Sequence, residues 1–158
     1  MQKTNAMRIL DKNKVEYEIK TYDENLTSGE LVAETLGERK EEVFKTLVTV
    51  ANNGEHFVFV IPVAETLDLK KSARVAGVKS VEMLKQKDLL PLTGYIHGGC
   101  SPVGMKKSFK TFVHKTAEKL EKFCVSGGHV GMQVKLAPNE LKRVVGFEYA
   151  DLIQANEN

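Results

Sequence analysis

The chain has 158 residues, 42% of them hydrophobic and 28% charged, which is typical of a globular protein with one sizeable core. Lysine and arginine number 23 against 21 acidic residues, and a formal charge of +2 is too small to indicate nucleic-acid binding by itself. No apolar stretch approaches the roughly 20 residues that cross a bilayer, and the first residues lack the apolar core of a secretory signal. We therefore expect a single domain over residues 1–158, located in the cytoplasm and not in a membrane.

The two cysteines, Cys100 and Cys124, fit neither a C-x-x-C motif nor a disulfide-rich framework. We expect both to be reduced thiols. Together with His97, His114 and His129 they are too scattered for a structural zinc spacing. The sequence therefore predicts no metal site and no cofactor.

The N-terminal part alternates helix and strand signals. Thr4 can cap a first helix, and residues 17–22 alternate like a strand. Thr27 followed by Glu30 is a capping box for a second helix, which Gly37 would end.

A hairpin follows. The strand-like runs 44–50 and 57–61 flank Asn53-Gly54, the strongest short hairpin signal, and Pro62 closes the second strand.

The rest of the chain contains both helical and strand-like hydrophobic periodicity. Gly77 would end one helix, and Pro138 can open another. Helices are expected over 69–76, 81–87 and 138–143, and strands over 109–114, 123–126 and 131–136. Because helices and strands interleave irregularly and several strands pair by hairpins, we predict an α+β (mixed α/β) fold rather than a doubly wound parallel one. Its expected form is a curved, partly closed mixed β-sheet surrounded by helices.

The loop Gly98-Gly99-Cys100-Ser101-Pro102-Val103-Gly104 is the most informative segment of the chain. Glycine lets backbone groups approach a ligand closely, and Pro102 fixes the exit of the loop. A second loop, Val125-Ser126-Gly127-Gly128, and the run 43–47 look able to join it. Together they suggest a pocket for a small molecule or an acyl group.

Lys45 stands out in that run because it shares a strand face with Val43 and Leu47. Burial of its ammonium without a partner would lower its pKa or cost several kcal/mol (order of magnitude), so such a lysine usually meets an anion. The alternative is an edge lysine that reaches into water. Thr46, on the opposite face, fits a core or strand-pair hydroxyl.

Cys100 and His97, three residues apart, raise the question of thiol catalysis. A catalytic cysteine needs its thiolate stabilised, and no acidic residue near His97 could orient the imidazole. Cys-His catalysis is therefore not favoured.

Basic residues cluster on one predicted helix and just after the glycine loop. Both clusters could face phosphates, and the alternative for both is a solvated surface. There is no ring of aromatic residues for base stacking and no phosphate-binding glycine motif after a strand. The clusters are Lys70, Lys71 and Arg74, and Lys106, Lys107 and Lys110.

A family resemblance rests on five segments in order: Phe44-Lys45-Thr46-Leu47, Leu67-Asp68-Leu69-Lys70-Lys71, Thr93-Gly94-Tyr95, Gly98-Gly99-Cys100-Ser101-Pro102 and Val125-Ser126-Gly127-Gly128. In that order they resemble the YbaK/EbsC family of Cys-tRNA(Pro)/Cys-tRNA(Cys) deacylases, relatives of the prolyl-tRNA synthetase editing domain. The resemblance covers nearly the whole chain. It implies a trans-editing enzyme that removes cysteine wrongly attached to proline tRNA, with a curved-sheet α/β fold.

The resemblance also implies roles for residues. Lys45 would contact the terminal nucleotide at the 3′ acceptor end of the aminoacyl-tRNA, and Gly99 would orient the ester. The loop to Pro102 would hold the aminoacyl group, with the second glycine loop beside it. The substrate's own thiol would attack the ester and form a thiolactone, and a prolyl-tRNA synthetase could supply tRNA selection. Further wall residues are Tyr22, Thr46, Ser101, Ser126, Gly127 and Gly128.

One position departs from the family pattern. Where relatives often carry an acidic residue after the second glycine loop, this chain has Gln133, which can donate and accept hydrogen bonds but carries no charge. Cysteine preference is therefore less secure than deacylation. An Ala-tRNA(Pro) deacylase and a non-catalytic oligonucleotide-binding or regulatory module remain the alternatives.

Overall fold

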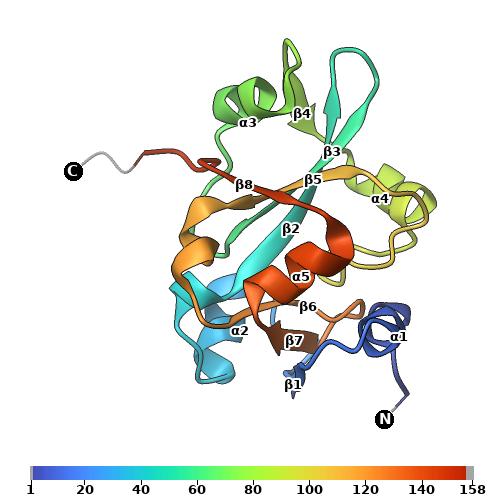
Figure 1. Cartoon of the computed structure of the whole chain (residues 1–158), viewed down its shortest axis with the longest axis vertical. Helices are drawn as coiled ribbons and strands as arrows, with labels where there is room; N and C mark the ends of the chain where they lie inside the picture. Colours follow the sequence, from blue (N-terminus) through green and yellow to red (C-terminus); the bar gives the residue numbers. More distant parts are fainter. Residues whose placement is uncertain (1, 156–158) are drawn as a thin grey trace.

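The computed structural model describes residues 2–155 of the chain. Strands from distant parts of the sequence lie side by side, with helices around them (Figure 1). In chain order the elements are α1 (Asn5–Lys12), β1 (Glu18–Thr21), α2 (Gly29–Thr35), the 3-10 helix η1 (Lys40–Glu42), β2 (Phe44–Ala51), β3 (His56–Pro62), α3 (Leu69–Ala76), β4 (Val81–Met83), α4 (Gln86–Thr93), β5 (Lys110–His114), the 3-10 helix η2 (Lys115–Lys119), β6 (Phe123–Ser126), β7 (Met132–Leu136), α5 (Pro138–Val145) and β8 (Glu148–Ala150).

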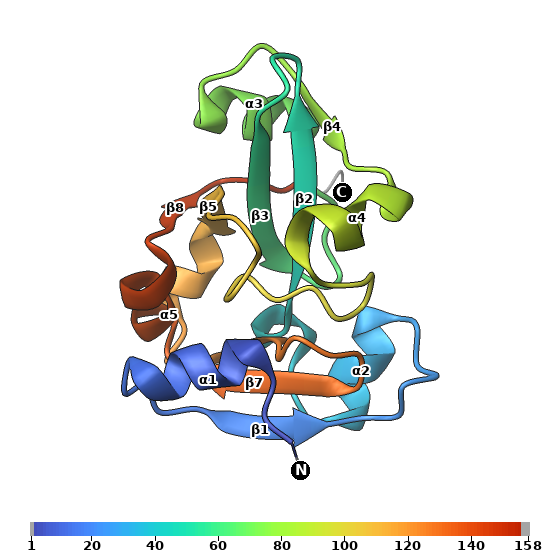
Figure 2. The same ribbon diagram turned by 90° about the vertical axis from the view of Figure 1, so that its right-hand side faces the viewer.

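The strands form two sheets. The smaller sheet has the order β1-β7-β6 and is antiparallel. The larger has the order β4-β2-β3-β5-β8 and changes from antiparallel to parallel between β3 and β5. A parallel bridge between Val43 and Cys124 links the two sheets. β2 and β3 lead from the level of the small sheet to the end of the molecule that carries α3 and β4 (Figure 2).

The predicted α+β class is confirmed, but the sheet is not the single, partly closed one expected. The parallel bridge lies at Val43, just before β2, and β2 itself pairs with β3 and β4 rather than with β6. The strands therefore form two open sheets in place of the single sheet expected.

The larger sheet separates two hydrophobic clusters. Val58 and Val60 of β3 face the main cluster, which α1, α5 and the small sheet complete. Phe57, Phe59 and Ile61 face the other side, where α3 and the C-terminal segment cover them. This alternation along β3 is what a strand buried on both faces requires.

Local signals account for several elements. Thr4 caps α1 by accepting a hydrogen bond from the Met7 N–H, and the Asn53-Gly54 hairpin joins β2 to β3 as expected, with Gly54 at a φ of +87°. Gly77, with a φ of +75°, ends α3.

Other expectations are corrected. Ser28, not Thr27, caps α2, since its hydroxyl accepts from the Leu31 N–H. The helix expected over 81–87 is wrong, because residues 81–83 form β4 on the open edge of β2. The helix begins later, as α4, and contains Pro91.

Glu38, just after α2, fastens that helix to the small sheet. Its carboxylate accepts hydrogen bonds from the ammonium groups of Lys20 on β1 and Lys135 on β7. Burial raises the pKa of Glu38, but the hydrogen bonds and charges of the two lysines outweigh that effect and hold the pKa below its usual value. The helix and the sheet are therefore joined by two ion pairs that share the buried Glu38 carboxylate.

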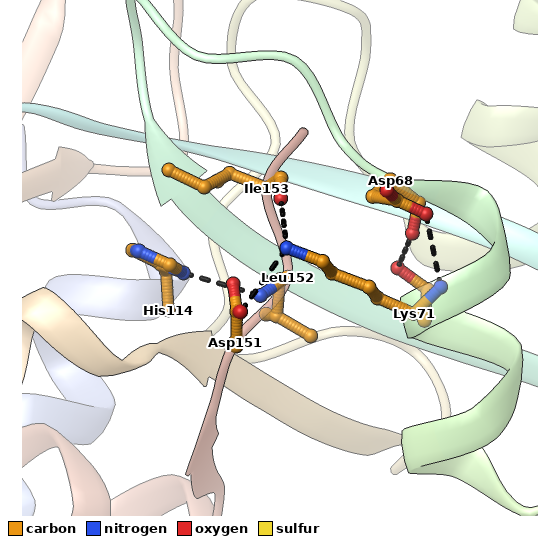
Figure 3. Close-up of polar contacts among 7 residues, drawn as sticks. Asp68, Lys71, His114, Asp151, Leu152 and Ile153 are labelled. Atoms are coloured by element: carbon orange, nitrogen blue, oxygen red, sulfur yellow. Dashed lines mark hydrogen bonds and ion pairs between the residues drawn. The ribbon is translucent and has the colours of Figure 1, made fainter. Parts of the chain in front are cut away.

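Residues 151–154, called here the C-terminal strap, lie between β5 and α3 (Figure 3). The Leu152 N–H donates to Nδ1 of His114 at 3.2 Å, and the Leu152 carbonyl accepts from the Asp68 N–H at 2.8 Å. The strap therefore joins the end of β5 to the start of α3.

Lys71 of α3 binds the same strap through its side chain. Its ammonium pairs with the Asp151 carboxylate at 3.1 Å and donates to the Ile153 carbonyl at 2.9 Å. The Gln154 N–H in turn donates to the Thr66 carbonyl at 2.9 Å. These bonds fix the segment 66–68 that precedes α3.

No helix among residues 2–155 is long and apolar enough to cross a membrane.

The strap makes stability depend on His114. Burial lowers the pKa of this imidazole below its ordinary value of 6.5, with Asp151 and Glu65 opposing and Lys115 and Lys71 reinforcing the shift. The unfolded chain therefore takes up this proton at higher pH than the folded chain, so stability is lost as the pH falls below about 6.5.

We expect the thermal midpoint of the wild-type protein to fall between about pH 7.5 and about pH 5.5, and to fall less in a His114→Gln variant. His97→Gln, which changes an exposed imidazole, is the matched control and should keep the wild-type pH dependence. Equal slopes in all three proteins would contradict this role of His114.

Candidate functional site

The two glycine loops pack against each other at Gly99. A Cβ on Gly99 would lie 2.9 Å from the Val130 amide nitrogen and 3.1 Å from the His129 carbonyl carbon. Only a residue without a side chain allows the backbones to approach this closely. Residues 98–101 and 126–131 therefore form one structure, called here the glycine cradle.

The Gly99 amide is used inside its own loop. It donates to the Ile96 carbonyl at 3.0 Å, closing a turn in which Gly98 has a φ of +87°. Such a turn needs a positive φ at its third residue, which explains the glycine. The Gly99 N–H, the donor that could polarise an ester carbonyl, therefore already has a partner. The Gly99 carbonyl oxygen can accept only from a donor such as an ammonium group.

The two serines of the cradle act as turn residues. Ser101 is fully buried and its hydroxyl accepts from the Val103 N–H at 3.1 Å. The Ser126 hydroxyl accepts in the same way from the Gly128 N–H at 3.2 Å. Side chains that bind backbone two residues ahead stabilise loops, so both serines shape the cradle. Ser101 and the buried Pro102 lie beneath its surface rather than lining it.

Gly127 and Tyr22 connect the cradle to the N-terminal part of the chain. The Gly127 carbonyl accepts from the Thr4 hydroxyl at 2.6 Å, and its N–H donates to the Met132 carbonyl. The Tyr22 N–H donates to the Gly131 carbonyl at 2.9 Å. Half-buried Tyr22 therefore lies at the edge of the cradle.

Two buried side-chain oxygens have no hydrogen-bond partner within residues 2–155: Thr46 Oγ1 on β2 and Gln133 Oε1 on β7. Gln133 is 7% exposed and lies opposite Ser126 of the cradle in the β6–β7 ladder. A buried polar atom without a partner costs about 1–3 kcal/mol. Each atom would therefore gain a partner if the donor of a ligand reached it.

Lys45 lies where the two sheets meet. Lys45 lies two residues after Val43, and Ser126 lies two residues after Cys124, the two residues of the parallel bridge. Each side chain is therefore on the same face of its strand as the bridge residue before it. β2 therefore brings Lys45 to the neighbourhood of the cradle.

The Lys45 side chain is half-buried and makes no hydrogen bond or ion pair with the residues that the structure describes. Burial lowers the pKa of its ammonium, which the charges of Glu30 and Glu65 partly oppose. It lines a groove of about 610 Å³ with Leu47 and Met83. An unpaired, partly desolvated cation facing a groove is suited to bind an anionic or polar ligand.

The predicted phosphate-contacting cations have different surroundings. Lys70 and Arg74 are exposed on α3, and Lys70 lines the same groove as Lys45. Lys71 does not join them, because the strap binds its ammonium. Its partners lie some eighty residues later in the chain, where a local pattern cannot find them. Lys106, Lys107 and Lys110 are exposed after the cradle loop, and the Lys110 ammonium lies over the Phe112 ring.

Neither cysteine is an activated thiol. Cys100 is 7% exposed, and burial raises its pKa to about 12. Cys124 is fully buried, and burial raises its pKa to about 12 as well. A thiol in such surroundings is not ionised near neutral pH. Among residues 2–155, no three His, Cys, Asp or Glu side chains are grouped so that they could hold a metal ion.

Comparison with known proteins identifies the family of this chain. A model of the aminoacyl-tRNA editing domain matches residues 23–144. The chain belongs to this family. It is 48% identical over 154 residues to a protein of Enterococcus faecalis named "Putative Cys-tRNA(Pro)/Cys-tRNA(Cys) deacylase EbsC", covering 96% of this chain and 93% of EbsC.

Solved structures share the fold of this editing domain. A hypothetical protein, APE2540, has a TM-score of 0.86 at 23% identity, covering 94% of this chain and 98% of that one. A "putative trans-editing enzyme for prolyl tRNA synthetase" has a TM-score of 0.83 at 21% identity, covering 98% and 100% of the two chains. At these identities the likeness concerns the fold alone.

The editing domain's cradle contains features that sequence patterns did not single out. The packing of His129 and Val130 on Gly99 and the unpaired oxygen of Gln133 both depend on contacts between distant segments. The glycines themselves were the available signal, since they mark where backbones approach closely.

The close packing at Gly99 can be tested with Gly99→Ala. The φ of Gly99 lies outside the left-handed range, so any loss comes from the added methyl group and not from backbone strain. We expect a loss of about 1–3 kcal/mol in the free energy of unfolding, measured by chemical denaturation. Ser108→Ala, at an exposed position in the same connection, should change little. An unchanged stability for Gly99→Ala would show that the two loops can separate without cost.

Proposed function

We propose that this chain is a trans-editing deacylase that removes cysteine mischarged onto tRNA(Pro), with Cys-tRNA(Cys) as a second substrate. Membership of the editing-domain family and the 48% identity to EbsC support the reaction class. The observation that carries the proposal is the character of the cradle. It offers backbone and unpaired acceptors beside a free lysine, with no activated nucleophile.

In this proposal the cradle holds the aminoacyl group and Lys45 holds the 3′-terminal nucleotide. The Gly99 carbonyl and the Gln133 Oε1 atom are acceptors suited to the substrate's α-ammonium group. Tyr22, Thr46, Gly127 and Gly128 border the group, while Ser101, Pro102 and Ser126 keep the loops in shape. The ammonium of Lys45 is suited to a phosphate or ribose oxygen because no described carboxylate neutralises it in an ion pair.

The substrate supplies the nucleophile. The cysteine sulfur attacks the ester carbonyl carbon, a C–S bond forms, and the C–O bond to the ribose breaks. The ribose oxygen leaves with the proton of the thiol, and water later opens the thiolactone to free cysteine. Holding the reacting atoms about 3–3.5 Å apart is enough to accelerate such a step greatly.

Discrimination is then chemical. An alanine ester can occupy the same cradle, but it has no thiol with which to cyclise. Because the substrate supplies the thiol, the buried Cys100 and Cys124 play no part in the reaction, which needs neither metal nor cofactor.

We further propose that residues 1–158 act as one editing unit in the cytoplasm. Lys70, Arg74, Lys106 and Lys107 contribute weak contacts to the tRNA backbone, and a prolyl-tRNA synthetase supplies the selection of the tRNA. The small number of free cations in the described surface of α3 supports this division of labour.

The test is release of labelled cysteine and alanine from tRNA(Pro) by wild-type protein and by Lys45→Ala. We expect wild-type protein to release cysteine, and the loss of the ammonium contact to lower kcat/KM by about 10–100-fold. Lys12→Ala, an exposed lysine on α1, and Cys100→Ala are the controls and should retain activity.

Two other outcomes would overturn the proposal. Release of alanine at the rate of cysteine would make the chain an Ala-tRNA(Pro) deacylase. Release of neither, with binding of the tRNA end that Lys45→Ala weakens, would make it a binding module.

A further inference from the structure

The groove beside Lys45 leads away from the cradle. Lys45 and Leu47 follow one another on one face of β2, and Met83 of β4 pairs with Thr49 further along the same strand. β2 runs in this direction from the small sheet toward α3 and β4 (Figure 2). A ligand bound at Lys45 therefore has a continuous path along β2 to α3.

The lining of the groove combines apolar contact surface with a second cation. Leu69 is 39% exposed and Met83 is 44% exposed, although both are large hydrophobic residues. Lys70 lies next to Leu69 on the same wall. At about 610 Å³ the groove has the size of a small-ligand site.

The wall that carries Leu69 and Lys70 is held in place. The C-terminal strap fixes residues 66–68 through the Asp68 N–H and the Lys71 ammonium (Figure 3). The carboxylate of Asp68 accepts from the Lys71 N–H at 3.0 Å and is therefore engaged as the cap of α3. Glu30 and Glu65 also act on Lys45 through their charges, but neither forms an ion pair with it. Lys45 and Lys70 are therefore unpaired cations on the groove within the described residues.

We propose that this groove binds the unpaired nucleotides that precede the terminal adenosine of the aminoacyl-tRNA, with one base against Leu69 and Met83 and one phosphate at Lys70. The inference rests on the proposed function, which puts the terminal nucleotide at Lys45. Bases pack on apolar side chains, and lysines beside them bind the backbone. Charge complementarity decides the occupant, since two free lysines on an apolar groove favour a single polyanionic strand over an acidic or apolar peptide that would meet only one of these features.

The experiment compares two substrates of different length: the cysteinyl ester of adenosine alone, and the cysteinyl ester of a CCA trinucleotide. We expect Leu69→Asn, Met83→Asn and Lys70→Gln each to lower kcat/KM for the trinucleotide ester by about fivefold or more. The adenosine ester lacks the nucleotides that reach the groove, so its kcat/KM should be unchanged. Leu90→Asn changes a leucine of α4 that is also exposed, at 50%; it is the matched control and should affect neither substrate.

Lys70→Gln alters an exposed side chain and tests the same point without disturbing the fold. It should also flatten the dependence of trinucleotide binding on salt, with the slope of log K against log salt falling by about 0.7. Equal losses for both esters, or no loss for either, would overturn the groove assignment.

Failure of the proposed function gives a different result. If wild-type protein cleaves neither ester, binding of the CCA trinucleotide that carries no amino acid still tests the groove. Binding weakened by Leu69→Asn but not by Leu90→Asn would support the groove without catalysis, and binding unaffected by both would overturn it.

Discussion

At the start of β2, the backbones of Val43 and Cys124 form a parallel bridge. Beside it the rings of Phe44 and Phe123 pack edge to face, with 5.1 Å between the ring centroids. This seam joins two sheets that otherwise have separate strand orders. It also sets the position of Lys45 relative to the cradle, because both lie directly beyond it. In the proposed function, a shift of this seam would move the lysine away from the glycine loops that hold the aminoacyl group.

The chemistry follows from which polar groups in the site already have partners. The Gly99 amide, the hydroxyls of Ser101 and Ser126 and the Lys71 ammonium are all engaged within the protein. The Lys45 ammonium and the Gln133 Oε1 atom are not, within the described residues. A site with shape and acceptors but without an ionised thiol is suited to position a substrate that brings its own nucleophile.

Sequence patterns predicted the parts of this structure that local chemistry determines. Thr4, Asn53-Gly54 and Gly77 mark element boundaries through backbone preferences that act over a few residues. The patterns failed for β4 and β8, because short edge strands depend on the neighbour that pairs with them. They also failed for Lys71. The sequence predicts a surface cation there, but the strap binds its ammonium and gives it a structural role. Glycine loops were recognisable, but the use of the Gly99 N–H within its own turn was not.

The central claim is that the substrate thiol, and no group of the protein, attacks the ester. The most direct measurement compares single-turnover cleavage of Cys-tRNA(Pro) and Ser-tRNA(Pro), whose aminoacyl groups differ only by sulfur in place of oxygen. The account predicts rapid cleavage of the cysteine ester and cleavage of the serine ester that is slower by about 100-fold or more, because a hydroxyl is a far weaker nucleophile than a thiol. Similar rates for the two esters would contradict it, since the nucleophile would then have to come from water or from the protein.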